Sequence, residues 1–156
     1  MSQEEAIKEN LIKKFSFLDG AVNIARPRRI SAVVDLDNFM AVFAYLAKEL
    51  QFGHLCTITG LDEQENLSFI YHLAADSGIV VNLKTSAPKA NPLIKTVSGY
   101  FAGAESYERE LVDLFGAKVE GLPKGNRYPL ADDWPKDQFP LRKDWITASD
   151  VKKEGR

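Results

Sequence analysis

Cysteine and histidine are scarce in this chain of 156 residues, which has one Cys and two His. The single thiolate of Cys56 can neither form an intrachain disulfide nor hold an iron–sulfur cluster or a cysteine-type zinc site. We interpret Cys56 as a small core residue. We interpret His54 and His72 as ordinary strand residues, because no carboxylate is placed beside them to complete a metal site. The composition therefore predicts no cofactor in this chain.

Surplus charge and long apolar runs are missing as well. The formal net charge is −2, whereas binding to nucleic acid needs clustered lysine and arginine. No apolar run reaches the roughly 18–20 residues that cross a bilayer. The charged segment 1–15 lacks the apolar stretch of a signal peptide. We therefore expect no nucleic-acid partner, and we expect any membrane link to pass through a partner protein.

Two helices and several strands are predicted in the first half of the chain. Ser2 and Glu5 form a capping box that opens one helix. Asp35 is a favourable N-cap for a second helix, which Gly53 is expected to end in a left-handed conformation. Apolar clusters and alternation predict strands over residues 29–34, 54–59, 67–74 and 79–83.

The connections between these strands complete the fold prediction. Residues 60–66 form a polar loop, and Asp76-Ser77-Gly78 is typical of a hairpin turn. The pattern predicts an α+β fold with a mainly antiparallel sheet of about four strands and helices on one face. Beyond the sheet we expect a linker over 85–92, a short helix over 93–101 and a longer helix over 105–115. Gly116 ends this last helix.

The character of the sequence changes after Gly116. Residues 117–145 contain four of the seven prolines and both tryptophans, with no helical or strand period. Proline favours extended backbone, and tryptophan, tyrosine and arginine are enriched at interface hot spots. We therefore divide the chain into an α+β domain, 1–116, and an extended docking arm with a tail, 117–156. The alternative is an arm packed wholly on its own domain, and composition does not decide between the two.

Charged residues follow one another at helical spacing in the helix before the arm. Arg109 lies four residues after Glu105 and four residues before Asp113. One interpretation is a solvated charge ladder worth a few tenths of a kcal/mol per pair. The other is a partly buried Glu–Arg–Asp network at an interface, where loss of Arg109 would strand buried carboxylates at a cost of roughly 3–5 kcal/mol.

Two motifs in this region resemble a known family. Residues 107–116 read Tyr-Glu-Arg-Glu-Leu-Val-Asp-Leu-Phe-Gly, and the arm contains Asp132-Asp-Trp134 and then Pro140-Leu-Arg-Lys-Asp144. In order and spacing these blocks are similar to the signatures of the 30-kilodalton (C) subunit of respiratory complex I. The resemblance is clear over residues 68–145.

Some positions depart from that family's usual pattern. The stretch 121–127 has no histidine, Tyr107 precedes the Glu-Arg-Glu, and Trp145 replaces a common tyrosine. In these respects the chain is closest to the homologous subunit of energy-converting, membrane-bound nickel–iron hydrogenases.

The resemblance implies an accessory role in a redox complex. It implies a cofactor-free, non-catalytic subunit in the hydrophilic part of the complex, peripheral and on the cytoplasmic side of the membrane. Its partners would be the large hydrogenase-like subunit and a neighbouring iron–sulfur subunit, with iron–sulfur clusters and a quinone site or nickel–iron centre in those partners. The partner interface that it implies consists of Glu108, Arg109, Glu110, Asp113, Arg127, Asp133, Trp134, Arg142, Lys143 and Asp144.

Two other functions stay open from the sequence. The chain could be an independent enzyme that uses Asp132, Asp133 and Asp137 as acid–base or metal groups, which predicts a concave pocket around them. It could also be an assembly factor that uses the same arm but leaves the mature complex.

Overall fold

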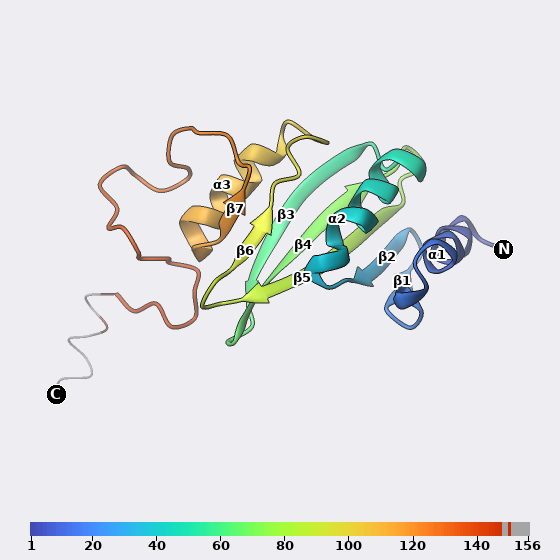
Figure 1. Cartoon of the computed structure of the whole chain (residues 1–156), viewed down its shortest axis with the longest axis horizontal. Coiled ribbons are helices and arrows are strands. Elements are labelled where there is room, and N and C mark those ends of the chain that lie inside the picture. Colours follow the sequence, from blue (N-terminus) through green and yellow to red (C-terminus); the bar gives the residue numbers. More distant parts are fainter. Residues whose placement is uncertain (148–149, 151–156) are drawn as a thin grey trace.

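The computed structural model describes residues 1–147 and Asp150. In chain order its elements are α1 (Gln3–Lys14), η1 (Ser16–Leu18), β1 (Val22–Arg26), β2 (Arg29–Val33), α2 (Leu36–Ala44), η2 (Tyr45–Glu49), β3 (His54–Asp62), β4 (Asn66–Ala74), β5 (Val80–Pro88), β6 (Leu93–Lys95), α3 (Ala104–Phe115) and β7 (Lys118–Glu120). Figure 1 shows helices packed against one twisted sheet, with an irregular C-terminal segment beside α3.

The predicted helix starts are confirmed by their caps. The Ser2 hydroxyl accepts a hydrogen bond of 3.1 Å from the Glu5 amide, and the Ser2 amide donates one of 2.6 Å to the Glu5 carboxylate. Asp35 accepts a bond of 2.9 Å from the amide of Asn38 and so caps α2. These bonds satisfy amide groups that the first helical turn leaves without partners.

The end of the second helix differs from the prediction. After Ala44 the helix continues as a wider π-turn through η2, and Gln51 takes the left-handed conformation with φ of 58°. Gly53 has ordinary backbone angles and is not the terminating residue.

The main sheet has five strands in the order β1-β2-β5-β4-β3. Only β2 and β5 are parallel, so the sheet is mainly antiparallel and the predicted α+β class is confirmed. The sheet has five strands and not the expected four, because β1 was not predicted. Pro27 interrupts the apolar pattern there, and it lies in the turn between β1 and β2.

Three local predictions around the sheet were wrong. Residues 60–62 continue β3, residues 85–88 continue β5, and residues 93–95 form strand β6 in place of a helix. β6 pairs in parallel with β7 as a separate two-stranded sheet. The predicted hairpin at 76–78 is confirmed, with Gly78 at φ of 78° and its amide bonded to the carbonyl of Ala75. Cys56, predicted to be in the core, is exposed at a bulge of β3.

The core lies between one face of the sheet and the helices. Tyr71 of β4 packs against Phe39 and Phe43 of α2, with ring centroids 4.7 Å and 5.7 Å apart. Gly60 of β3 leaves room for the Phe115 ring of α3, because a Cβ at Gly60 would lie 2.5 Å from that ring. The helices α2 and α3 therefore share a sheet face, as predicted.

Candidate docking site

Residues 118–120 of the predicted arm form strand β7, so from here on the arm means residues 121–147. The arm leaves β7, loops away from α3 and returns past the C-terminal end of that helix (Figure 1). It has no helix or strand, in agreement with its proline content. Its path is set by polar anchors on α3 and on the β3–β4 hairpin.

The first anchor is the carboxylate of Asp113. It accepts hydrogen bonds from Nε of Arg127 at 3.3 Å and from the amide of Leu130 at 3.1 Å. Arg127 in turn donates from Nη1 to the carbonyl of Trp134 at 2.7 Å. Asp113 is buried, so the Asp113–Arg127 ion pair attaches the arm to the interior side of α3.

Arg109 forms a second anchor, one turn before Asp113. Its Nη2 donates to the carbonyl of Pro123 at 2.5 Å and lies 3.7 Å from the carboxylate of Glu105. Gly125 lies against the guanidinium, since a Cβ there would come within 2.6 Å of Cζ. The structure shows neither the predicted charge ladder nor the predicted Glu–Arg–Asp network in full. Arg109 pairs with Glu105, but Asp113 pairs with Arg127 of the arm.

The C-terminal end of α3 is the third anchor. The carbonyls of Leu114 and Phe115 accept from the Leu141 amide at 3.1 Å and from Nε of Arg142 at 2.6 Å. These are carbonyls that a helix end leaves without partners, and the cation also suits the negative end of the helix dipole. Arg142 lies over the ring of Phe139, 4.8 Å from its centroid.

Gly116 makes this return possible. It ends α3 in the left-handed conformation, at φ of 73°, as predicted. A Cβ at this position would lie 2.6 Å from the ring of Phe139. Both the helix end and the seat of the arm therefore need glycine.

The fourth anchor joins the arm to the β3–β4 hairpin. The carboxylate of Asp62 accepts from the amide of Lys143 at 2.8 Å and from Nζ of Lys89 at 2.7 Å. Lys89 also lies 3.0 Å from the carboxylate of Asp144. Burial of Asp62 would raise its pKa, but the bonds from Lys89, Lys143 and Gln64 together outweigh it and hold the pKa below the usual value.

Glu108 has a different role from its predicted one. Its side chain is fully buried, and it accepts from the Thr96 hydroxyl at 2.6 Å and the Val97 amide at 2.7 Å. Burial raises its pKa, although both hydrogen bonds oppose the shift. Glu108 therefore fixes the loop after β6 to α3 and does not reach the surface.

The other predicted interface residues lie nearer the surface. Asp133, Lys143 and Asp144 are exposed, and Glu110 and Trp134 are half-buried. The rings of Trp134 and Trp145 lie 5.9 Å apart, and Nε1 of Trp134 donates to the carbonyl of Gln138 at 2.9 Å. The structure thus gathers the predicted residues around α3 and the arm, but it divides them into internal anchors and surface groups.

The surface of the arm exposes three large apolar side chains among charged residues such as Lys124, Asp133 and Lys136. Tyr128, Leu141 and Ile146 are 51%, 51% and 58% exposed. A hollow of about 460 Å³ lies between the arm and α3, and Arg109, Arg127 and Asp137 are among its lining residues. Asp132 and Asp133 do not line it. Among the described residues no three His, Cys, Asp or Glu side chains gather as metal ligands.

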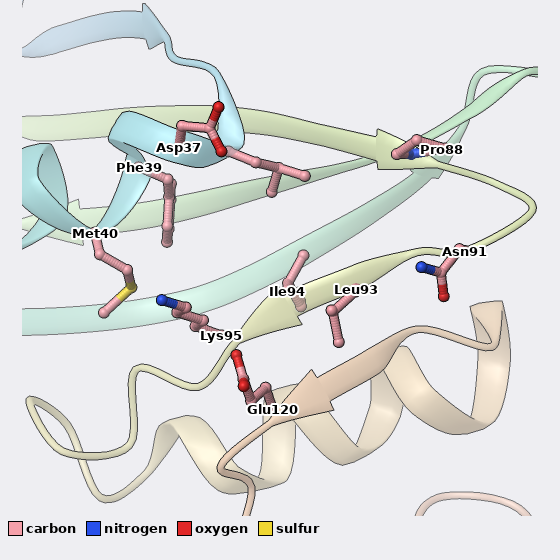
Figure 2. A pocket seen from close by; sticks show the side chains of 10 residues that line it. Asp37, Phe39, Met40, Pro88, Asn91, Leu93, Ile94, Lys95 and Glu120 are labelled. Carbon is pink, nitrogen blue, oxygen red and sulfur yellow. The ribbon is translucent and has the colours of Figure 1, made fainter.

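Figure 2 shows a second hollow, of about 470 Å³, between α2 and strand β6. Phe39, Met40 and Ile94 give it apolar walls, while Lys95 and Glu120 lie at the end next to β7. It is lined by no residue of the arm.

Sequence reasoning missed three residues that position the arm and its platform. Asp62 and Lys89 fall in segments that were predicted to be a polar loop and a linker, and Thr96 in a predicted helix. Their roles depend on bonds to residues far along the chain, up to 81 positions away for Asp62 and Lys143. No local signal marks such pairs.

Comparisons with known proteins agree with this geometry. The profile of the family described as "Respiratory-chain NADH dehydrogenase, 30 Kd subunit" matches residues 32–151. The C subunit of the F(420)H(2) dehydrogenase of Methanosarcina mazei is 37% identical over 142 residues, 89% of each chain. The C subunit of the NADH-quinone oxidoreductase of Moorella thermoacetica is 30% identical over 116 residues, 72% of this chain and 77% of its own.

Solved structures extend the likeness to three dimensions. A chain of the membrane-bound sulfane sulfur reductase, an archaeal respiratory membrane complex, superposes with a TM-score of 0.83 and 28% identity, covering 98% of this chain and 91% of its own. The trypsin-resistant fragment of Nqo5 shares the fold, with a TM-score of 0.63, 23% identity and coverage of 76% of this chain and 99% of its own. The family predicted from the two motifs is confirmed: the chain belongs to the 30 kDa subunit family of respiratory-chain NADH dehydrogenase.

Proposed function

We propose that this chain is a non-catalytic subunit in the hydrophilic part of a complex I-like redox complex. It docks on the large hydrogenase-like subunit and a neighbouring iron–sulfur subunit, and those partners carry the redox centres whose electron transfer is coupled to ion translocation. Support comes from relatives that are named as C subunits of quinone- and F420-dependent dehydrogenases and from a structural relative in a respiratory membrane complex.

We further propose a peripheral position on the cytoplasmic side of the membrane. Among residues 1–147, no helix has both the length and the apolar content to cross a bilayer. Attachment through partner subunits is consistent with that finding. The preference for a hydrogenase-type complex over a true complex I stays a prediction.

The observation that carries the docking proposal is the two-sided character of the arm. Its anchoring groups bond inward, to α3 and Asp62, while Tyr128, Leu141 and Ile146 are exposed among charged side chains on its surface. Covering half of such a side chain contributes on the order of 1 kcal/mol, so three of them supply a useful part of an interface.

The predicted interface residues divide into two roles under this proposal. Glu110, Asp133, Trp134, Lys143 and Asp144 are surface groups that contact the partner. Arg109, Asp113, Arg127 and Arg142 hold the arm in position. Glu108 holds the loop after β6 on α3.

Point substitutions on the outer side of the arm test the proposal. We expect Leu141→Ser with Ile146→Ser to reduce recovery of partner subunits about tenfold when tagged full-length chain is purified from solubilised membranes, because roughly 1–2 kcal/mol of apolar burial is lost. The melting temperature of the free chain should stay the same, since both side chains are exposed.

A matched control uses exposed apolar residues away from the arm. Phe17→Ser with Leu93→Ser removes similar side chains, each 46% exposed, from η1 and β6. Equal recovery with both double variants would contradict a docking role for the arm. Recovery of the chain in less than stoichiometric amount from the mature complex would indicate an assembly factor.

A further inference from the structure

The second face of the five-stranded sheet has no helix over it in the part of the chain that the structure describes. Phe69 and Tyr71 point to the helices, so their neighbours in β4 point the other way. The strand register places further residues on this side, which we call the open face: Ser31, Val33, Thr57, Thr59, Leu61, Ser68, Ile70, His72, Asn82, Lys84 and Ser86.

Polar side chains of the open face are already bonded to one another across the strands. His72 shares hydrogen bonds of 2.8 Å with Thr59 and of 2.8 Å with Asn82. Ser68 is itself fully buried; it donates to the Glu63 carboxylate and shares a bond of 2.7 Å with Ser86. A partner can therefore cover them without leaving buried donors and acceptors unmatched, which is the usual cost of covering polar surface. Val33, 55% exposed, and Leu61, 38% exposed, add apolar area.

Two arginines at the edge of the open face have no counter-charge among residues 1–147. Arg26 of β1 and Arg29 of β2 are direct cross-strand partners, and like charges in that position destabilise a sheet. Within residues 1–147 no carboxylate lies within ion-pair distance of either guanidinium. The cation in the middle of the face, Lys84, is paired with Glu63 at 2.7 Å.

The turn that joins these arginines is itself strained. Arg28 has φ of 62°, a conformation that favours glycine or asparagine, and its amide is held by the carboxylate of Glu4 at 2.8 Å. Beside the turn, a hollow of about 440 Å³ is lined by Arg26, Arg29 and residues of the open face that include Asn82. The surplus positive charge therefore faces an open recess.

We infer that the open face is a second docking surface, and that the segment seated on it belongs to another subunit of the same complex and carries carboxylates that pair with Arg26 and Arg29. Planar guanidinium groups bind carboxylates in a bidentate manner, and here the anion also relieves the repulsion between the two cations. This inference rests on the proposed function. The family match begins at residue 32, after both arginines, so it does not by itself imply this contact.

Charge reversal and photo-crosslinking test the inference in the intact complex. Tagged full-length chain with Arg26→Glu and Arg29→Glu should recover partner subunits from solubilised membranes about tenfold less well at low salt, with the difference shrinking as salt rises. Lys13→Glu with Lys14→Glu makes the same charge change on the exposed end of α1 and should recover them normally. Arg26→Lys with Arg29→Lys should retain part of the recovery.

A photoreactive residue at Val33 should crosslink to an Asp- or Glu-containing peptide of another subunit in the purified complex, and a probe at Lys13 should not. If the Val33 probe yields no such peptide while a probe at Leu141 crosslinks, the open face is not a docking surface and the proposed function stands. If neither probe crosslinks within the complex, both proposals fail. A Val33 crosslink to a second copy of this chain would overturn the inference in favour of self-association.

Discussion

At the scale of single residues, the buried carboxylates of this chain organise its loops. Asp62, Glu108 and Asp113 each accept hydrogen bonds from distant backbone amides, and each fixes a segment that has little regular structure of its own. The bonds offset the cost of burying charge. Glu108 and Asp113, which lie in the motif at residues 107–116, thus position neighbouring segments of the chain.

Tyr71 shows the opposite situation, a buried polar atom without a partner. Its side chain is fully buried, and within the described residues its hydroxyl has no hydrogen bond. Burial raises the pKa of this phenol, so it stays neutral at any ordinary pH.

We expect Tyr71→Phe to raise the free energy of unfolding by about 1 kcal/mol, because the desolvation cost disappears while the ring stays. Urea unfolding measures this free energy, and Tyr107→Phe, at a half-buried tyrosine, is the control. If Tyr71→Phe is less stable than wild type, the hydroxyl of Tyr71 makes a stabilising bond.

At the scale of elements, α3 is the platform for both neighbouring segments. Through Glu108 it holds the loop after β6, and through Arg109, Asp113 and its last carbonyls it holds the arm. Its end at Gly116 determines where the arm can return.

Gly116→Ala tests that dependence. An alanine in the left-handed conformation costs about 1–2 kcal/mol, and its Cβ would also displace Phe139 from the helix end. We expect a lower melting temperature and faster proteolysis within residues 121–147. Gly99→Ala is the matched control, because a Cβ there meets no atom within 4 Å. If the arm of the Gly116 variant resists protease as the wild type does, Phe139 is not what seats it.

At the scale of the whole molecule, the two docking surfaces that we propose differ in chemistry. The arm exposes apolar side chains next to α3. The open face presents polar side chains that are hydrogen-bonded across neighbouring strands, with two arginines at its edge. Figure 1 shows the arm at one end of the molecule and the β1–β2 region at the other. Under these two proposals, one chain would bridge two neighbouring subunits.

The ionic anchor at Asp62 joins distant parts of the chain, and its strength should depend on pH. Its folded pKa lies below the ordinary value of 3.8, so its contribution is present above that value and is lost as pH falls through the folded pKa. We expect Asp62→Asn to lower the free energy of unfolding by roughly 3 kcal/mol at pH 7, since Lys89 loses a buried partner. The difference from wild type should shrink as pH falls below 3.8 and through the folded pKa, as measured by urea unfolding across the acid range. A difference independent of pH would show that the charge of Asp62 is not what matters.

Local features of the fold were predictable because their causes lie within a few residues. The caps at Ser2 and Asp35, the turn at Gly78 and the end of α3 at Gly116 each depend on neighbours no more than five positions away. The two motifs were equally readable, since they are contiguous strings, and they identified the family.

The arrangement of these parts was decided only by tertiary contacts. The parallel pairing of β2 with β5, the short β6–β7 sheet and the bond from the Lys143 amide to Asp62 join residues that are far apart in sequence. The sequence by itself determined the kinds of elements and the family. Which motif carboxylates turn inward and which face of the sheet stays open depend on long-range packing, because burial is a property of neighbours in space, which short-range patterns do not specify.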